Sequence, residues 1–184
     1  MQLHQLEHLI RAAATITDRY EFIVVGSQSI LGSVERPPRE CLLSNEADIY
    51  PKDAEELSDK IDGAIGEGSR FHDEFGYYAQ GVDSTTAVLP KDWERRLNRL
   101  QTMGTEGRIA YCIDVLDLFM SKCAANREKD RAFNVVLLRA GLVEARNALQ
   151  LVQDMPVDDA SQVRMTSLIT RLAAQADASG PLTP

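Results

Sequence analysis

The chain has 184 residues, of which 44% are hydrophobic and 26% charged, which is enough for one globular domain with a small helical appendage. Its formal net charge of -8 argues against broad binding to DNA, because such binding needs a basic surface that displaces phosphate counterions. No apolar run approaches the roughly 20 residues that span a bilayer, and the three cysteines form no CxxC pair. We therefore expect a cytoplasmic protein with reduced thiols that binds neither a membrane nor bulk DNA.

The first 113 residues alternate between helical and strand patterns, as is typical of a mixed α/β core. Apolar residues recur at helical spacing from Leu3 to Ile16, whereas Phe22–Val25 is a β-branched run that ends at a glycine. The expected elements are a helix over 3–17, a strand over 22–25, a short helix over 27–31, a strand over 41–50, a helix through 57–65 capped by Asp53 and Glu56, a hairpin of 77–80 with 85–89, and strands over 97–103 and 108–113. The glycine-rich segment 63–81 is expected to be mostly loop.

From Asp114 onward only helical patterns remain. One expected helix begins at Asp114, and three more run over 129–140, 144–153 and 159–174. The fold class predicted is therefore α/β (α+β), with a small mixed-sheet core over 1–113, a helical subdomain over 114–178 and a disordered tail over 179–184.

Two acidic residues, Glu46 and Asp48, stand two apart on the strand expected over 41–50. Side chains alternate along a strand, so both carboxylates point to one face, about 7 Å apart. Their neighbours Ala47 and Ile49 point the other way, into a core. Such a pair can bind one or two divalent metal ions that bridge nucleotide phosphates. The alternative is an ordinary polar face on a solvent-exposed strand.

A second motif, Gly26-Ser27, follows the apolar strand and opens a helix. A glycine at this corner lets backbone amides approach a phosphate, and the serine hydroxyl can donate a hydrogen bond to a phosphate oxygen. An ordinary strand-to-helix turn also favours glycine and serine, so this alternative stays open.

Together these motifs resemble the signature of the nucleotidyltransferase superfamily with the polymerase-β type of fold. The closer resemblance is to a bacterial family of uncharacterised nucleotidyltransferase-like proteins, distantly related to the AbiE-type toxin nucleotidyltransferases. The matching stretches are FIVVGSQSILGS (22–33), EADIYP (46–51), IDGAIGEGSRFHDEFGYYAQGV (61–82) and DLFMSKCAANREKDRAF (117–133).

The resemblance implies a metal-dependent enzyme that moves a nucleoside monophosphate from an NTP to an acceptor hydroxyl of tRNA or protein. It implies Mg²⁺ or Mn²⁺ at Glu46 and Asp48, and phosphate contacts from Gly26 and Ser27. It also implies a toxin–antitoxin or defence setting, with a cognate antitoxin or other partner protein. The superfamily's third carboxylate has no clear counterpart; Asp83 is the nearest candidate.

A basic cluster, SKCAANREKD, supplies the remaining candidates. The resemblance implies that Lys122, Arg127, Lys129 and Asp130 contribute to the nucleotide site, with Lys122 and Asp130 in catalytic roles. If one helix continued through Arg127, Lys122 and Asp130 would share a face. Lys122 would then neutralise phosphate charge, and Asp130 would orient either Lys122 or the attacking group. The alternative is a solvated helix face with local ion pairs.

Two departures favour a rival function. The first acidic residue is Glu46, where most active members of the superfamily have Asp, and the interval from Ser27 to Glu46 is longer than usual. Both fit a catalytically inactive member that binds a partner or acts like an antitoxin. His72, beside Asp73 and Glu74, is a further candidate for a base or a metal ligand, or a locally packed residue.

Overall fold

The computed structural model describes residues 1–180, and it divides into two compact units. The sheet unit comprises Met1–Ala87 and Arg96–Asp114, and the helical unit comprises Val88–Arg95 and the chain from Val115 onward. The boundary predicted at 113/114 lies one residue from the change of unit after Asp114, and Val88–Arg95 also belongs to the helical unit. Of the tail predicted over 179–184, residues 181–184 lie outside the described residues, and Ser179 is the last residue of a helix.

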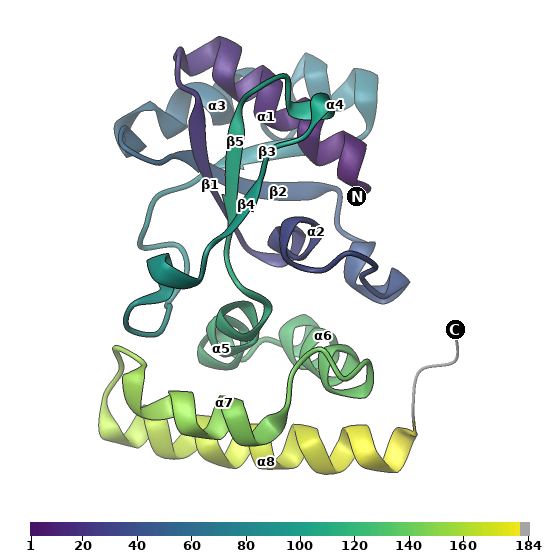
Figure 1. The fold of residues 1–184 in the computed structure, drawn as a ribbon, viewed down its shortest axis with the longest axis vertical. Coiled ribbons are helices and arrows are strands. Elements are labelled where there is room, and N and C mark those ends of the chain that lie inside the picture. Colours follow the sequence, from purple (N-terminus) through teal and green to yellow (C-terminus); the bar gives the residue numbers. More distant parts are fainter. Residues whose placement is uncertain (181–184) are drawn as a thin grey trace. The chain divides into compact units, whose positions relative to one another are not determined.

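The sheet unit is a five-stranded mixed sheet with helices, which confirms the predicted α+β class (Figure 1). Its elements are α1 (Leu3–Thr17), β1 (Glu21–Val25), α2 (Ile30–Ser33), β2 (Glu46–Pro51), α3 (Ser58–Ile65), α4 (Arg70–Phe75), β3 (Tyr78–Gly81), β4 (Asn98–Leu100) and β5 (Ile109–Cys112). Four 3-10 turns join them: η1 (Ser27–Ser29), η2 (Arg39–Leu42), η3 (Glu55–Leu57) and η5 (Met103–Thr105).

The strand order is β3-β2-β1-β5-β4. β1 pairs antiparallel with β2 and parallel with β5, while β2 pairs parallel with β3, and β4 pairs antiparallel with β5. The strand carrying the two acidic residues, β2, therefore lies between β1, which ends just before Gly26, and β3.

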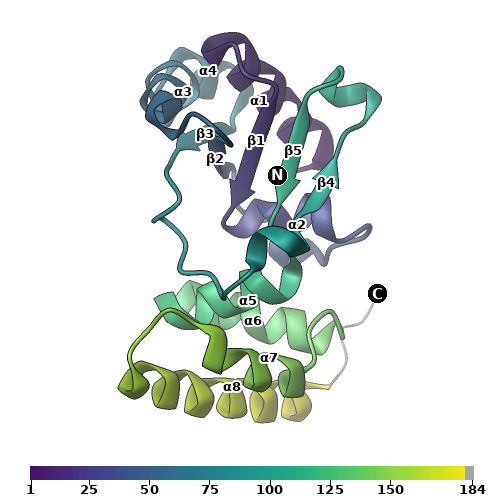
Figure 2. The same cartoon turned by 60° about the vertical axis from the view of Figure 1, so that its left-hand side comes forward.

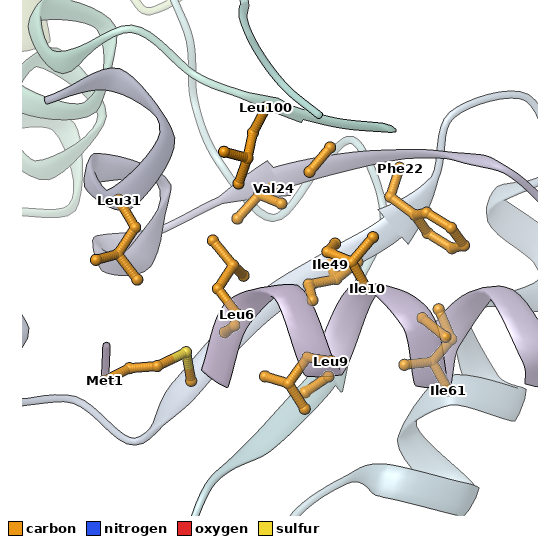
Figure 3. Close-up of a cluster of buried hydrophobic side chains, with 14 of the residues drawn as sticks. Met1, Leu6, Leu9, Ile10, Phe22, Val24, Leu31, Ile49, Ile61 and Leu100 are labelled. Atoms are coloured by element: carbon orange, nitrogen blue, oxygen red, sulfur yellow. The ribbon is translucent and has the colours of Figure 1, made fainter. Parts of the chain in front are cut away.

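One face of this sheet is a closed apolar layer. Phe22, Val24 and Ile49 point toward α1 and are fully buried there (Figure 3). Ala47 belongs to the same buried cluster. The cluster also contains Met1, Leu6, Leu9, Ile10, Leu31, Ile61, Ala79, Leu100 and Cys112. Because strand side chains alternate, residues 46, 48, 78 and 80 must point to the opposite face.

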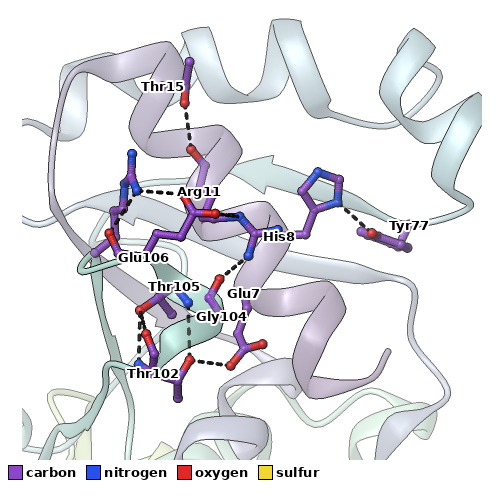
Figure 4. Close-up of polar contacts among 10 residues, drawn as sticks. Glu7, His8, Arg11, Thr15, Tyr77, Thr102, Gly104, Thr105 and Glu106 are labelled. Carbon is purple, nitrogen blue, oxygen red and sulfur yellow. Dashed lines mark hydrogen bonds and ion pairs between the residues drawn. The ribbon is translucent and has the colours of Figure 1, made fainter.

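Polar contacts fix α1 against the turn η5 that precedes β5 (Figure 4). Arg11 donates to the carbonyl of Gly104 and pairs with Glu106, and Glu7 accepts a hydrogen bond from the Thr102 hydroxyl. A Cβ at Gly104 would overlap the Glu7 carboxylate, so a larger residue here requires the Glu7 side chain to move. These contacts hold α1 on the sheet from outside the apolar layer.

The predicted hairpin of 77–80 with 85–89 is wrong. β3 forms, but it pairs in parallel with β2, and 85–89 contains no strand. The register sets Ala79 opposite Ala47 in the apolar layer, and Tyr77 is buried in the same layer, so burial of apolar side chains wins over local turn preference. Asp83 then turns the chain away by accepting hydrogen bonds from Thr85.

Three other details of the sheet unit differ from expectation. The strand predicted over 41–50 begins only at Glu46, because 39–42 forms η2. Asp53 and Glu56 do not cap a helix: α3 starts after Leu57 without a side-chain cap. The glycine-rich segment 63–81 contains α4, whose amide at His72 is capped by Ser69 and which ends at Gly76 with φ +73°.

The helical unit packs its helices in layers, with α8 running beside α6 and α7 (Figure 2). Its elements are α5 (Val115–Ala125), α6 (Glu128–Arg139), α7 (Ala145–Leu151), η6 (Val152–Asp154) and α8 (Asp159–Ser179); η4 (Trp93–Arg96) precedes β4. The buried side chains include Leu118, Phe119, Leu137, Met165 and Ile169. None of the helices in the described part of the chain is long and apolar enough to span a membrane.

Candidate functional site

The strand β2 presents the two acidic side chains on the face of the sheet that the apolar layer leaves open. Glu46 and Asp48 are each half-buried, while Ala47 and Ile49 between and beyond them are fully buried in the core. This alternation is the one expected from the sequence, and it holds both carboxylates on a rigid strand rather than on a loop.

The Gly26-Ser27 turn lies directly against Asp48. β1 and β2 are antiparallel with Val25 opposite Asp48, so the residue after Val25 passes beside the carboxylate. Gly26 has φ +65° and ψ -167°, a conformation open essentially to glycine alone. A Cβ at Gly26 would overlap Asp48 Oδ2 and lie 3.0 Å from Asp48 Cγ. Glycine is therefore required here both for its conformation and for the close approach of the carboxylate.

Hydrogen bonds stabilise the rest of this turn. The Ser29 hydroxyl donates to the Gly26 carbonyl at 2.8 Å, and the fully buried Gln28 donates from Nε2 to the Cys41 carbonyl at 3.4 Å. The expected helix is short, consisting of η1 and the four-residue α2. The turn thus brings the Gly26 backbone beside the Asp48 carboxylate. The helix after it is too short to add a large helix dipole at this point.

The neighbouring strand β3 borders the acidic pair with Tyr78 and Gln80. Tyr78 stands opposite Glu46 and Gln80 opposite Asp48 in the parallel register, so the four side chains share one face. The pKa of Tyr78 is raised, first by burial and then by the charges of Glu46, Glu67 and Asp48 and a hydrogen bond to Glu46. The hydroxyl therefore keeps its proton at neutral pH.

His72, on α4, packs its ring against Tyr78. Its ring lies 4.6 Å from the ring of Tyr78, tilted by 51°. Its Nδ1 accepts a hydrogen bond from the Gly68 amide at 3.1 Å. The local packing interpretation of His72 is thus the one that the geometry supports.

The donor set of this face suits a hard divalent cation. Carboxylate and amide oxygens, with the tyrosine and serine hydroxyls near them, are ligands and neighbours that Mg²⁺ and Mn²⁺ accept. Within residues 1–180, no three or more His, Cys, Asp or Glu side chains gather as a metal-binding group. The acidic pair would therefore have to be completed by substrate phosphates, water or neutral oxygens.

The basic cluster lies in the helical unit, where Lys122, Arg127 and Asp130 form one ion network. Lys122 Nζ lies 3.1 Å from Asp130 Oδ1, and Arg127 Nε lies 2.6 Å from Asp130 Oδ2. Asp130 is fully buried and Lys122 nearly so, with its ammonium 4.3 Å from the centre of the Phe133 ring. Burial alone would raise the pKa of Asp130, but the hydrogen bond from Arg127 and the charge of Lys122 lower it.

A continuous helix through Arg127 is wrong. α5 ends at Ala125, Asn126 takes φ +51°, and Arg127 is the N-cap residue of α6. Lys122 and Asp130 nevertheless meet, because α5 and α6 pack side by side and bring them together across the break. Lys122 is buried rather than on a solvated face, whereas Lys129 is exposed.

Asp83, the nearest candidate for a third carboxylate, is exposed, and its carboxylate accepts hydrogen bonds from the Thr85 amide and hydroxyl in the turn after β3.

The residues that sequence reasoning missed are Tyr78 and Gln80. Their signal was present in the alternation of YYAQG, with Tyr77 and Ala79 apolar and buried. Finding it required the parallel pairing of β3 with β2, which joins residues about thirty positions apart.

Comparison with known proteins identifies a family for this chain. No curated protein matches the chain, and no solved structure matches it either. Residues 1–167 match the family described as "Nucleotidyltransferase of unknown function (DUF6036)", which covers both the sheet unit and most of the helical unit. The distant AbiE-type relationship stays a prediction. Because this match spans most of the chain, the protein belongs to this nucleotidyltransferase family of unknown function.

Proposed function

We propose that this protein is a metal-dependent nucleotidyltransferase of the cytoplasm that transfers a nucleoside monophosphate from an NTP to an acceptor hydroxyl. The observation that carries the proposal is the contact of Gly26 with Asp48, since it joins a phosphate-approaching turn to an acidic pair on one face of the sheet. The family to which the chain belongs supports the reaction class.

In this proposal Glu46 and Asp48 hold Mg²⁺ or Mn²⁺, which supplies charge neutralisation and orients the triphosphate. Ser27 donates to a phosphate oxygen, and the glycine at 26 allows the chain to pass without a side chain in the way. Positioning and electrostatic stabilisation account for most of the rate enhancement in phosphoryl-transfer chemistry.

Lys122, Arg127, Lys129 and Asp130 stay candidates for the nucleotide site. What supports a role for them is the ion network, in which a buried carboxylate fixes Arg127 while its side chain remains 63% exposed. A guanidinium held in this way is preorganised for bidentate contact with phosphate. The exposed Lys129 would contribute as a point charge.

The test is transfer of label from α-labelled and γ-labelled NTP, with Mg²⁺, to a total tRNA fraction and to a total protein fraction. We expect label from the α position alone in one acceptor class, with loss of transfer in Asp48→Asn. The matched control is Asp59→Asn, an exposed acid on α3. Label from the γ position, or equal transfer by Asp48→Asn, would refute nucleotidyl transfer at this face.

The second candidate is a catalytically inactive nucleotidyltransferase-fold protein that binds a partner, in the manner of an antitoxin. It is favoured by one observation: β3 places Tyr78 and Gln80, rather than an acid, beside the carboxylate pair. Nucleotide binding without label transfer to either acceptor fraction would support this candidate. A toxin–antitoxin or defence setting, with a cognate partner protein, belongs to both candidates and rests on the resemblance alone.

A further inference from the structure

A cavity of about 680 Å³ lies within the helical unit, and none of the residues proposed above for the nucleotide site lines it. It forms where the segment Val88–Arg95 meets the turn η6 and the two residues that follow this turn. Its volume falls in the range of about 300–1,000 Å³ that is typical of sites enclosing a ligand. The cavity is therefore a candidate binding site in its own right.

The two segments that form the cavity are fixed to each other and to the core. The Lys91 amide donates a hydrogen bond to the Asp154 carbonyl at 2.8 Å, which joins the segments directly. Asp92 takes φ +59°, which turns the chain immediately before η4. Leu89 and Met155 line the cavity and are buried, so each segment is anchored in the core. The cavity is thus preformed, and binding needs to order little of the chain.

The lining combines one large aromatic ring with an excess of negative charge. Trp93 is half-buried, so part of its indole ring stays accessible to a ligand in the cavity. Three acidic residues, Asp92, Glu94 and Asp154, line the cavity and are exposed. Among the described residues that line it, Lys91 alone is basic. The cavity therefore favours a cation that can also contact an aromatic ring.

Two of these carboxylates are available to a ligand. Asp92 Oδ1 lies 3.8 Å from Arg95 Nε, so this acid already has a basic neighbour. Within residues 1–180, neither the Glu94 nor the Asp154 carboxylate forms an ion pair or accepts a hydrogen bond. The chain also carries a formal net charge of -8, and its field attracts a basic partner toward this surface.

The cation whose chemistry matches this lining is a guanidinium group. A guanidinium is planar and weakly hydrated, so it can stack on an indole ring while its N–H groups donate to carboxylates. An ammonium is a compact, strongly hydrated charge, and it gains less from the ring. The cavity is larger than one side chain, so the residues that flank an arginine can enter it as well.

We propose that this cavity is a docking site for an arginine-containing segment of a partner protein. The arginine side chain lies against Trp93, and Glu94 and Asp154 accept hydrogen bonds from its guanidinium group. This inference is independent of the proposed nucleotidyl transfer, because the cavity shares no residue with the site proposed for that reaction.

Trp93 is the only tryptophan in the chain, so its fluorescence reports on this cavity. The full chain is titrated with an end-blocked hexapeptide of alternating glycine and arginine, and with matching peptides that carry lysine or glutamate. We expect a saturable change in Trp93 emission with the arginine peptide and none with the glutamate peptide. Affinity for the lysine peptide should be about threefold weaker, because an ammonium stacks less well on the ring. Affinity for the arginine peptide should also fall as salt is raised.

Variants assign the binding to the cavity. Glu94→Gln combined with Asp154→Asn removes both available carboxylates, and affinity for the arginine peptide should fall about tenfold. The matched control is Glu144→Gln combined with Asp177→Asn, which changes the net charge equally at exposed positions outside the cavity and should keep wild-type affinity. Trp93→Leu, followed by calorimetry, should weaken binding about threefold. Circular dichroism checks that each variant keeps its fold.

Several outcomes would overturn the inference. One is the absence of a saturable signal when folded wild type is titrated with the arginine peptide. Another is an equal loss of affinity in the cavity variant and in the matched control, because the net charge of the chain would then explain the binding. Free arginine amide that binds as tightly as the peptide would make the cavity a site for a small cation, and would also overturn docking of a protein segment.

Discussion

Replacing Gly26 by alanine tests the contact on which the proposed site depends. The residue has φ +65° and ψ -167°, a region that residues with a side chain avoid. The added Cβ would also overlap Asp48 Oδ2, so the carboxylate must move for the variant to fold. The substitution therefore strains the backbone and displaces a proposed metal ligand at once.

The magnitude has two parts. Holding alanine in this conformation costs about 1–3 kcal/mol of unfolding free energy. Moving the Asp48 carboxylate off its position adds roughly 1 kcal/mol, the size typical of a single strained side chain. We expect a loss of about 2–4 kcal/mol in total, a large fraction of the 5–15 kcal/mol typical of a folded protein.

The assay is urea denaturation of the wild type and variant, with Mn²⁺ titration of the folded proteins beside it. Gly63→Ala is the matched control, because Gly63 lies exposed in α3 and an added Cβ there meets nothing within 4 Å. Alanine in a helix is better than glycine by about 0.5–1 kcal/mol, so this control should be neutral or stabilising.

Making Gly26→Ala in an Asp48→Ala protein separates the cost of the overlap with Asp48 from the cost of the backbone conformation. In an Asp48→Ala protein the overlapping oxygen is gone, so Gly26→Ala should cost only its backbone part. Unfolding free energy and Mn²⁺ affinity that are unchanged in Gly26→Ala, as in Gly63→Ala, would refute the close approach of this turn to Asp48.

Three further predictions follow from the same side chains. Gln80→Glu adds a third carboxylate beside Asp48, so Mn²⁺ affinity should rise about tenfold, and unchanged affinity in the same titration would place Gln80 away from the metal. Asp130→Asn removes the carboxylate charge that lies 3.1 Å from the buried Lys122 ammonium, so the free energy of unfolding should fall by about 3 kcal/mol. Glu144→Gln, in an exposed pair with Arg146, should change it by less than about 1 kcal/mol. Equal losses in urea denaturation would contradict a structural role for the buried pair. The folded-state pKa of Asp130 is lowered, so its contribution is fully present above the unfolded value of about 3.9 and is lost as pH falls through the folded pKa; acid titration should therefore show a smaller loss of stability in Asp130→Asn than in wild type.

Periodicity alone predicted the elements with strong local patterns. The helix over 3–17 has the bounds of α1, and β1 and β5 fall within the strands expected over 22–25 and 108–113 to within one residue. The orientation of Glu46 and Asp48 also followed from alternation against Ala47 and Ile49, because a buried face fixes the register of a strand.

The errors arose where distant contacts decide the outcome. The pairing of β3 with β2 depends on burial of Ala79 beside Ala47, and nothing within 77–89 records it. The separate helices predicted from Asp114 and over 129–140 are present, and Asn126 in the left-handed conformation ends α5 between them. The shared face of Lys122 and Asp130, by contrast, assumed one continuous helix, whereas these side chains meet across the packed pair of α5 and α6. The i and i+8 spacing therefore correctly predicted that Lys122 and Asp130 lie close together, but they do so between two packed helices and not on one face of a single helix.

Calorimetric titration of each NTP, with and without Mg²⁺, tests the central claim most directly, since that claim is that the Gly26-Ser27 turn and the Glu46/Asp48 pair form one metal-nucleotide site. We predict Mg²⁺-dependent binding of at least one NTP by wild type, and loss of that binding in the Glu46→Ala/Asp48→Ala double variant with its fold intact. Absence of NTP binding by folded wild type, with or without metal, or binding that the double variant retains, would contradict the account.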